Sequence, residues 1–336
     1  ASGYVGWGDS TQSHMHGIRY KTSRYLLGAL ETAGNYKPNF IDYQTQMTWK
    51  VGDRREARGE RRKAWEITLL GNFSQNMYEF APESSETPFG TMQQTLNIQK
   101  EHTGKEKDLF RTAFAALSVQ HQLARDIRLG MDLSGFYTHE QETFDIDTEY
   151  NLSEKPADEA MGDGQLAMGD GQLEMGDGQL AMGNGQGVLG TGHPHEHARN
   201  TLQAGMVTLA HTGEWKSGEN TLQWGVSGQV EIINDRINEW EWRDSMGYSM
   251  PNLPQEMALY YALKSRTNML SGRVQAYAQD SYRWHTDNGD VMLTGGMRLN
   301  WWSYTNEVLP SPRVSVAWMP GWKRDFTFRV ATGLYY

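Results

Sequence analysis

The densest group of residues that could bind a metal ion lies between positions 193 and 197. His193, His195 and His197 alternate along the chain, with Glu196 between two of them. Imidazole nitrogens are common ligands of zinc and nickel. Neighbouring residues at a junction between a loop and a strand rarely converge on one ion, so solvated loop histidines are the simpler interpretation. We therefore expect no resident metal, and these three histidines remain the candidates for one.

A seven-residue unit, close to Met-Gly-Asp-Gly-Gln-Leu-Ala, occurs four times between residues 161 and 187. Stacked Gly-Asp turns could bind calcium. However, calcium takes 6 to 8 oxygen ligands, and each unit offers at most one carboxylate, with Asn184 replacing Asp in the last. The known calcium-binding repeat of this type also has a period of nine. We expect an exposed loop, where a low-complexity insertion is best tolerated, and leave calcium binding open.

No catalytic constellation stands out in the chain. The sequence has no Gly-x-Ser-x-Gly elbow, no His-Glu-x-x-His and no phosphate loop. It has no Cys, which excludes a thiol nucleophile and a disulfide framework. His139 with Glu140 or Asp145 could serve a hydrolase at the rim of a barrel, although their spacing carries no specificity. We expect no catalytic residues and no cofactor, with a rim-active outer-membrane hydrolase as the alternative.

The elements that must carry these residues are β-strands. Leu222, Trp224, Val226, Val230 and Ile232 share one parity, and the residues between them are Gln, Gly, Ser, Gln and Glu. A period of two indicates a strand, because successive side chains leave it on opposite faces. The same alternation recurs at 42–51, 65–74, 127–138 and 290–301.

Many strands with one apolar and one strongly polar face are typical of a barrel in lipid with a hydrated lumen. Mean hydropathy is -0.69, and no run approaches the roughly 18 apolar residues of a spanning helix. The 12 Trp and 16 Tyr lie near the ends of the alternating runs, as aromatic girdles at a membrane boundary would require. Aromatic residues are also good strand formers, which is the alternative explanation.

The lengths of the connections alternate as well. Long segments are expected at 81–108, 148–197 and 243–269, with a charged turn at 53–62. Short turns, such as 124–126, 216–220 and 286–289, separate the long segments. Tight periplasmic turns and extended extracellular loops are typical of outer-membrane barrels.

We predict an all-β fold, an antiparallel transmembrane β-barrel with long extracellular loops, forming one domain over 1–336. About eleven spanning strands are expected, and such barrels normally have an even number. We therefore expect a part of a larger barrel, whose two unpaired edges could not stand alone in hydrocarbon. A soluble β-rich adhesin or glycan-binding protein is a further alternative, but its strands would be about 5 to 6 residues long. The net charge of -10 disfavours nucleic acid as a partner.

Several segments, taken in order, resemble the barrel of TonB-dependent outer-membrane receptors of the Bacteroidetes type. They include RYLLGALETAGNYKPNFIDYQTQ (24–46), GNFSQNMYEFAPESSETPFGT (71–91), EWEWRDSMGYSMP (239–251), SPRVSVAWMP (311–320) and FTFRVATGLYY (326–336). The Met-Gly-Asp-Gly repeat departs from the pattern. The resemblance implies a barrel of about 22 strands around an N-terminal plug, in the outer membrane of a Gram-negative bacterium. Neither a plug nor a TonB box can be matched to residues here, so we expect the chain to begin after the plug.

The resemblance also implies uptake of a scarce solute, such as a siderophore, cobalamin or a glycan, powered by the TonB complex. Outer-membrane lipid and a surface lipoprotein are further expected partners. In such a barrel the polar side chains of Gln229, Glu231, Arg298 and Arg329 would face the lumen and contact the plug or the solute.

Overall fold

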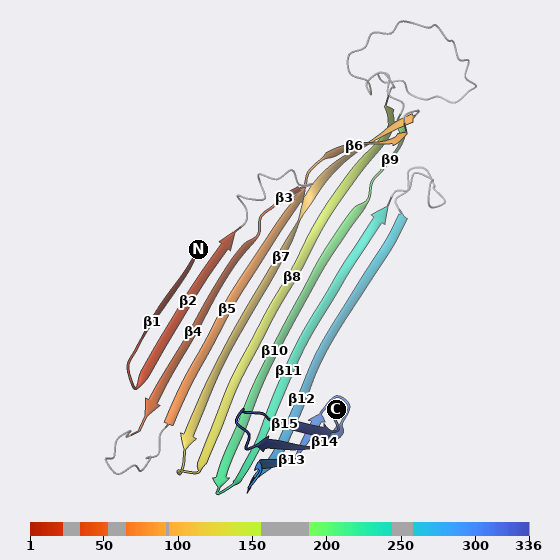
Figure 1. Ribbon diagram of the computed structural model, residues 1–336. Coiled ribbons are helices and arrows are strands. Elements are labelled where there is room, and N and C mark those ends of the chain that lie inside the picture. The colour runs from red at the N-terminus through yellow and green to blue at the C-terminus, as the bar shows by residue number, and fades with distance from the viewer. Residues whose placement is uncertain (23–33, 53–64, 92–93, 156–187, 244–257, 336) are drawn as a thin grey trace, which may run out of the picture.

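The computed structural model describes residues 1–22, 34–52, 65–91, 94–155, 188–243 and 258–335. These residues form a single antiparallel sheet of fifteen strands (Figure 1). Within these ranges there is no helix long and apolar enough to span a bilayer. The predicted all-β antiparallel fold is therefore confirmed.

Twelve strands follow one another across the sheet, close to the eleven expected from the sequence. Three short strands lie off this path: β3 (Gly34–Tyr36) pairs with β5, β6 (Ser85–Thr91) with β7, and β9 (Val188–Gly192) with β8. The main strands are β1 (Ser2–Gly8), β2 (Gln12–Thr22), β4 (Asn39–Val51), β5 (Trp65–Pro82), β7 (Gln94–Gln122), β8 (Ile127–Lys155), β10 (His195–Ser217), β11 (Asn220–Arg243), β12 (Ala258–Thr286), β13 (Gly289–Trp302), β14 (Glu307–Pro320) and β15 (Phe328–Gly333).

The pairing register keeps the apolar residues of neighbouring strands on one face. Met47, Leu69, Leu117, Leu133 and Leu209 stand opposite one another in turn on β4, β5, β7, β8 and β10. Side chains of one parity share a face of a strand, so the whole sheet has an apolar face and a polar face. This two-sided division is the one that the alternation in the sequence predicts.

Apolar residues on the apolar face form a band with two visible limits. One limit carries tryptophans, including Trp49, Trp65, Trp215, Trp284 and Trp318, as the girdle hypothesis predicts. The other is a polar row of directly opposed residues, Gln75, Arg111, His139, Gln203, Asn234 and Asn268. Between these limits the apolar face of each strand covers stretches such as 65–73, 127–137 and 222–232. These match the roughly 9 to 11 residues with which a tilted strand crosses a bilayer.

The sheet has almost no core of its own. Ala198 and Ala317 are the buried apolar residues among those described, whereas Val207 is 56% and Val230 50% exposed. The accessible surface is 24918 Å², against roughly 14,000 Å² expected for a compact monomer of this mass. A continuous apolar surface of this kind marks an interaction with another phase or molecule.

The two ends of the strands differ. The connections 9–11, 123–126, 218–219 and 287–288 all lie at one end, here called the turn end. At the opposite end, here called the far end, β7, β8 and β10–β12 continue well beyond the band (Figure 1).

Most of the described residues in the expected long loops are strand, which corrects that prediction. Residues 85–91 and 94–108 belong to β6 and β7, and 258–269 to β12. Residues 148–155 and 195–197 are also strand, in β8 and β10. Backbone pairing continues there although both faces are polar, so the alternation that marks a strand in the sequence is lost. The repeat at 161–187 and the charged turn at 53–62 lie outside the described residues.

The sheet remains open. The shorter strands β13–β15 lie near the turn end, and the two chain ends are on different edges of the sheet (Figure 1). Among the described residues no pairing joins β1 to β15. This agrees with the expectation of a partial barrel with two unpaired edges.

Candidate functional site

The polar face carries a hollow of about 390 Å³ near the far end. Five carboxylates line it, Asp108, Glu140, Glu142, Asp235 and Glu239, and we call it the acidic hollow. No Lys or Arg lines this hollow. It lies beyond the polar row that limits the apolar band, so its carboxylates are outside the membrane-spanning stretch of their strands.

The register of four strands brings these acids together. Asp108 of β7 stands opposite Glu142 of β8, and Leu202 of β10 lies between Glu140 and Asp235 of β11. Glu239 stands opposite Ala198, whose small side chain is fully buried. Because each of the five acids occupies the polar-face parity of its own strand, all of them share one face.

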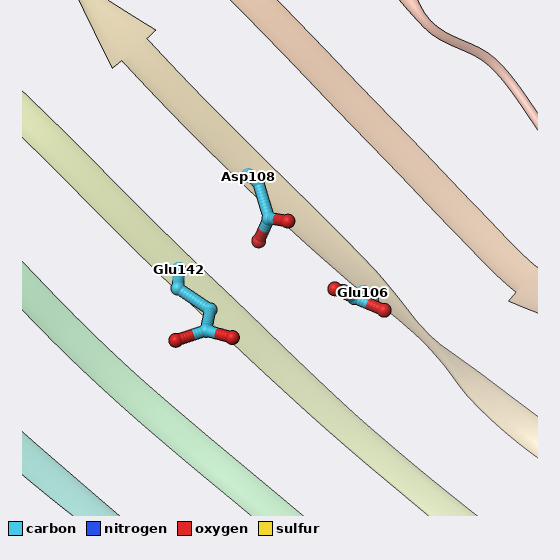
Figure 2. Close-up of side chains that lie close together, drawn as sticks. All are labelled: Glu106, Asp108 and Glu142. Carbon is cyan, nitrogen blue, oxygen red and sulfur yellow. The ribbon is translucent and has the colours of Figure 1, made fainter.

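Three carboxyl groups at the edge of the acidic hollow are especially close. Figure 2 shows Glu106 and Asp108 on one strand and Glu142 on the next. One potential ligand atom of each residue lies within 4.8 Å of the others. Burial raises the pKa of Glu106 to about 6, and repulsion from Asp108 and Glu142 adds to the shift. Burial also raises the pKa of Asp108, with a contribution from Glu142. This is the one group of potential metal ligands found among the described residues.

Neutral donors hold Glu142 and Glu239 in place. The Asn200 side-chain amide donates to Glu142 Oε2 at 3.0 Å and to Glu239 Oε1 at 2.5 Å. Its orientation is fixed, because Asn200 Oδ1 accepts the backbone N–H of Asn238 at 3.1 Å. The Tyr261 hydroxyl donates to Glu239 Oε2 at 3.1 Å. The acids are thus oriented without being neutralised.

An aromatic hydroxyl stands beside the same acids on the next strand. Tyr78 of β5 lies opposite Asp108. Burial, followed by the charge of Glu106, raises the pKa of Tyr78 to about 12. Its hydroxyl therefore stays protonated at neutral pH and can donate a hydrogen bond.

The chemistry of the acidic hollow is that of a hydrogen-bond acceptor with negative charge. Carboxylates bind sugar hydroxyls and cationic groups, and they repel anions. With one ligand oxygen from each, the three carboxylates supply three of the 6 to 8 oxygens that calcium takes. The arrangement therefore suits a hydroxyl-rich or cationic solute better than a bare metal ion.

The predicted lumen residues all lie on the polar face, but they do not form one site. Gln229 donates to Glu231, which also accepts from Ser271 Oγ at 2.8 Å and pairs with Arg273 at 3.3 Å. Arg298 lies over the ring of Tyr277, 5.8 Å from its centroid. Tyr277 is six positions from Ser271 on β12, a separation of roughly 20 Å. Arg329 Nη2 donates to Ser315 Oγ at 3.4 Å.

The predicted histidine candidates lie on the other face, beyond the band, where they contact acids. His195 Nε2 is 2.8 Å from Asp145 Oδ1, and His197 Nδ1 is 3.5 Å from Asp145 Oδ2. His193 Nε2 lies 3.6 Å from Glu149. The bond from His195 is the main reason that the pKa of Asp145 is lowered. The structure thus gives these histidines carboxylate partners, and does not gather the three around one point.

The residues considered for a rim hydrolase are not assembled. His139 and Glu140 are consecutive on β8, so their side chains leave opposite faces of the sheet. Asp145 is six positions further along the strand, roughly 20 Å away, and is engaged by His195 and Arg199. A nucleophile and a base need hydrogen-bond contact, which this placement rules out for these three residues.

The cluster of Glu106, Asp108 and Glu142 was not predicted from the sequence. The spacing of Glu106 and Asp108 does place them on one face of a strand. Glu142 joins them only through the register of β7 with β8, which fixes its place opposite Asp108. Two consecutive strands each carry two acids at alternate positions: Glu106 and Asp108 in β7, and Glu140 and Glu142 in β8. This pattern was the signal in the sequence that could have indicated the cluster.

Comparison with known proteins now adds to this geometry. The family model described as "TonB dependent receptor-like, beta-barrel" matches residues 64–334. No curated protein matches the chain. The translocator domain of the autotransporter NalP from Neisseria meningitidis aligns over 99% of this chain and 82% of that chain, with 8% identity and a TM-score of 0.26. A TM-score this low adds nothing about the fold.

The two-faced antiparallel sheet and the family match define a class, the membrane β-barrel receptors and transporters. Within that class the chain belongs to the TonB-dependent receptor-like β-barrel family.

Proposed function

We propose that this chain forms part of the barrel wall of an outer-membrane receptor of the Bacteroidetes type. The receptor takes up a scarce solute in a Gram-negative bacterium. The observation that carries the proposal is the apolar band, limited by tryptophans on one side and by the polar row on the other. The band meets the length that a strand needs to cross a bilayer. The family adds the dependence on TonB and, with it, energised transport without a chemical step.

The turn end then faces the periplasm and the far end faces outward, because such barrels have short periplasmic turns. The acidic hollow lies on the polar face beyond the band, so in this orientation it is on the outer part of the lumen. It lies at the end of the polar strand extension that is nearest the band.

The charge of the acidic hollow narrows the solutes that we consider. A siderophore, cobalamin and a glycan are the classes expected for such a receptor. Five unneutralised carboxylates oppose an anionic ferric chelate, whereas they accept hydrogen bonds from sugar hydroxyls. We therefore place a hydroxyl-rich solute, a glycan before cobalamin, at this surface, with the TonB complex and a surface lipoprotein as partners.

The test uses the complete barrel that contains this chain, folded in lipid nanodiscs, and a set of named probes: cobalamin, a ferric catecholate chelate and a panel of bacterial and plant oligosaccharides. An oligosaccharide is expected to bind, or otherwise cobalamin. The variant E140Q/E142Q/D235N should weaken that binding at least tenfold. The matched control D132N removes a charge from the polar face of β8 nearer the turn end, and should bind like the wild type.

Two results would contradict the proposal. Preference for the anionic ferric chelate, or equal binding by the triple variant, would remove the acidic hollow as the ligand surface. Failure of the complete barrel that contains this chain to enter lipid, with stable solubility in the absence of detergent, would remove the receptor assignment as a whole.

A further inference from the structure

The apolar face carries a second hollow, immediately beyond the apolar band and of opposite character. Its volume is about 350 Å³, and Arg236 and Arg266 line it together with Asp235 and neutral polar residues. Those neutral residues on the apolar-face parity are Thr201, Gln203, Asn234 and Asn268. We call it the arginine hollow.

The two arginines stand directly opposite each other on β11 and β12. Both are exposed, and among the described residues neither has a hydrogen-bond or ion-pair partner. The neighbouring Asp235 occupies the opposite parity and so belongs to the polar face. Two other cations on the apolar face are paired: Arg199 contacts Asp145 at 3.1 Å, and Lys107 contacts Glu79 at 3.7 Å.

Like charges placed directly opposite on a sheet destabilise it. No carboxylate occurs at apolar-face positions of β11, or of β12 between Lys264 and Val274, to offset them. A bound anion would offset the repulsion. Two guanidinium forks with nearby amide and hydroxyl donors suit a phosphate group, which Arg binds in a bidentate manner.

The surface next to the arginine hollow indicates which kind of phosphate-bearing molecule would bind there. One row closer to the turn end, Ile232 and Leu270 stand opposite each other, and Leu270 is 73% exposed. Val230 and Val274 continue this apolar surface. A molecule with a phosphate in the hollow would therefore extend its remaining part along the apolar band.

The side of the arginine hollow next to β13 is open. β13 ends at Trp302, which stands opposite Arg273 of β12. Arg266 lies further toward the far end, so among the described residues it has no strand beside it on that side. A headgroup could approach from there without displacing any part of the sheet that the structure describes.

We propose that the arginine hollow binds the phosphate of an anionic membrane lipid whose acyl chains lie on the band around Ile232 and Leu270. The proposal rests on the membrane placement proposed above and is independent of the solute. It assigns Arg236 and Arg266 to the outer surface of the barrel wall, as a site for a lipid rather than for the transported ligand.

The experiment uses the protein in dodecyl maltoside, a detergent without phosphate or charge, with phosphatidic acid as the probe. Native mass spectrometry measures the bound lipid. The wild type is expected to retain phosphatidic acid, and R236Q/R266Q to bind it at least tenfold more weakly. The control R128Q/R283Q removes the same charge from the polar face near the turn end, and should stay within twofold of the wild type.

Two further probes separate the sources of binding. Diacylglycerol with the same acyl chains lacks the phosphate and should bind the wild type no better than it binds R236Q/R266Q. Inorganic phosphate at the same concentration should not displace the lipid. Three results would each overturn the proposal. They are binding of phosphatidic acid by the variant as tightly as by the wild type, retention of diacylglycerol by the wild type equal to its retention of phosphatidic acid, and displacement of the lipid by inorganic phosphate.

Thermal unfolding distinguishes a lipid site from a structural role. In dodecyl maltoside alone, R266Q should unfold at a higher temperature than the wild type, because it removes the opposed like charge. Phosphatidic acid should raise the unfolding temperature of the wild type and not that of R236Q/R266Q. Lower stability of R266Q without lipid would show that the arginines support the fold instead. Insertion into vesicles, measured separately, shows whether a failure concerns this site or the membrane placement itself.

Discussion

Glu106 and Asp108 share one face of β7, and Glu142 of β8 lies beside them on the same face. The pKa of Glu106 rises to about 6 because burial and the charges of Asp108 and Glu142 disfavour its ionised form. Such a group is retained at a cost in stability at neutral pH. Polar sites that lower stability are common where a surface must bind a ligand.

Replacing this carboxyl group gives a prediction with a defined sign. The folded-state pKa lies above the ordinary value of 4.5, so the folded state holds the proton longer and stability falls as pH rises from 4.5 to about 6. We expect E106Q to be more stable than the wild type at pH 8 by about 1 kcal/mol, after allowance for solvent screening, and equal to it at pH 4. Urea unfolding at the two pH values measures this.

The exposed Glu307, at the start of β14, provides the matched control. E307Q should change stability at pH 8 by less than E106Q does. If E106Q proved less stable than the wild type at pH 8, the carboxylate would be supporting the fold, and the repulsion described above would be wrong.

The long strands differ along their length in how strongly their two faces differ in polarity. Within the band, the faces differ so strongly that the sequence predicts the strand and its orientation, as for 222–232 of β11. Beyond the polar row, β8 continues through His139, Glu142 and Asp145 to Lys155 with polar residues on both faces. The alternation vanishes there although the hydrogen bonds persist, which is why these segments were expected to be loops.

The same distinction explains how much of the candidate site could be predicted. The polar-face placement of Gln229 and Glu231 follows from parity alone. The meeting of Glu142 with Asp108, or of Arg236 with Arg266, depends on register across separate strands. Register is set by turns and by the match of apolar rows, and a single sequence does not give it at the far end.

The tight turns at the turn end give a prediction about register. Gly289 has φ 122°, and a Cβ there would come 2.2 Å from the backbone oxygen of Met319. Gly218 has φ 59°, with open space around it. We expect G289A to destabilise the protein by about 2 kcal/mol or more, and G218A by about 1 kcal/mol.

The loss in each glycine variant would appear as a lower unfolding temperature and a smaller folded fraction by heat-modifiable gel migration. Both substitutions add a methyl group to a glycine with positive φ, so the larger loss in G289A reports the contact with β14 together with the less accessible φ of Gly289. Equal losses would show that this close approach does not constrain the β12–β13 turn.

The whole molecule is a single layer whose apolar face has no protein to cover it among the described residues. Its edges at β1 and β15 are unpaired, and open edges are not tolerated in hydrocarbon. In the proposed membrane placement, these edges would need further pairing. In the same placement, the tryptophan limit and the polar row mark the two boundaries of the bilayer.

The most direct test of this account is a cysteine scan along β11, made simple because the chain has no Cys. Single cysteines are placed at 222–241 in protein folded in lipid vesicles and are exposed to a small, water-soluble thiol reagent. We predict protection at even positions from 222 to 232, reaction at odd positions, and reaction at both parities from 234 onward. Equal reaction of the two parities between 222 and 232 would contradict the central claim that one face meets lipid and the other meets water.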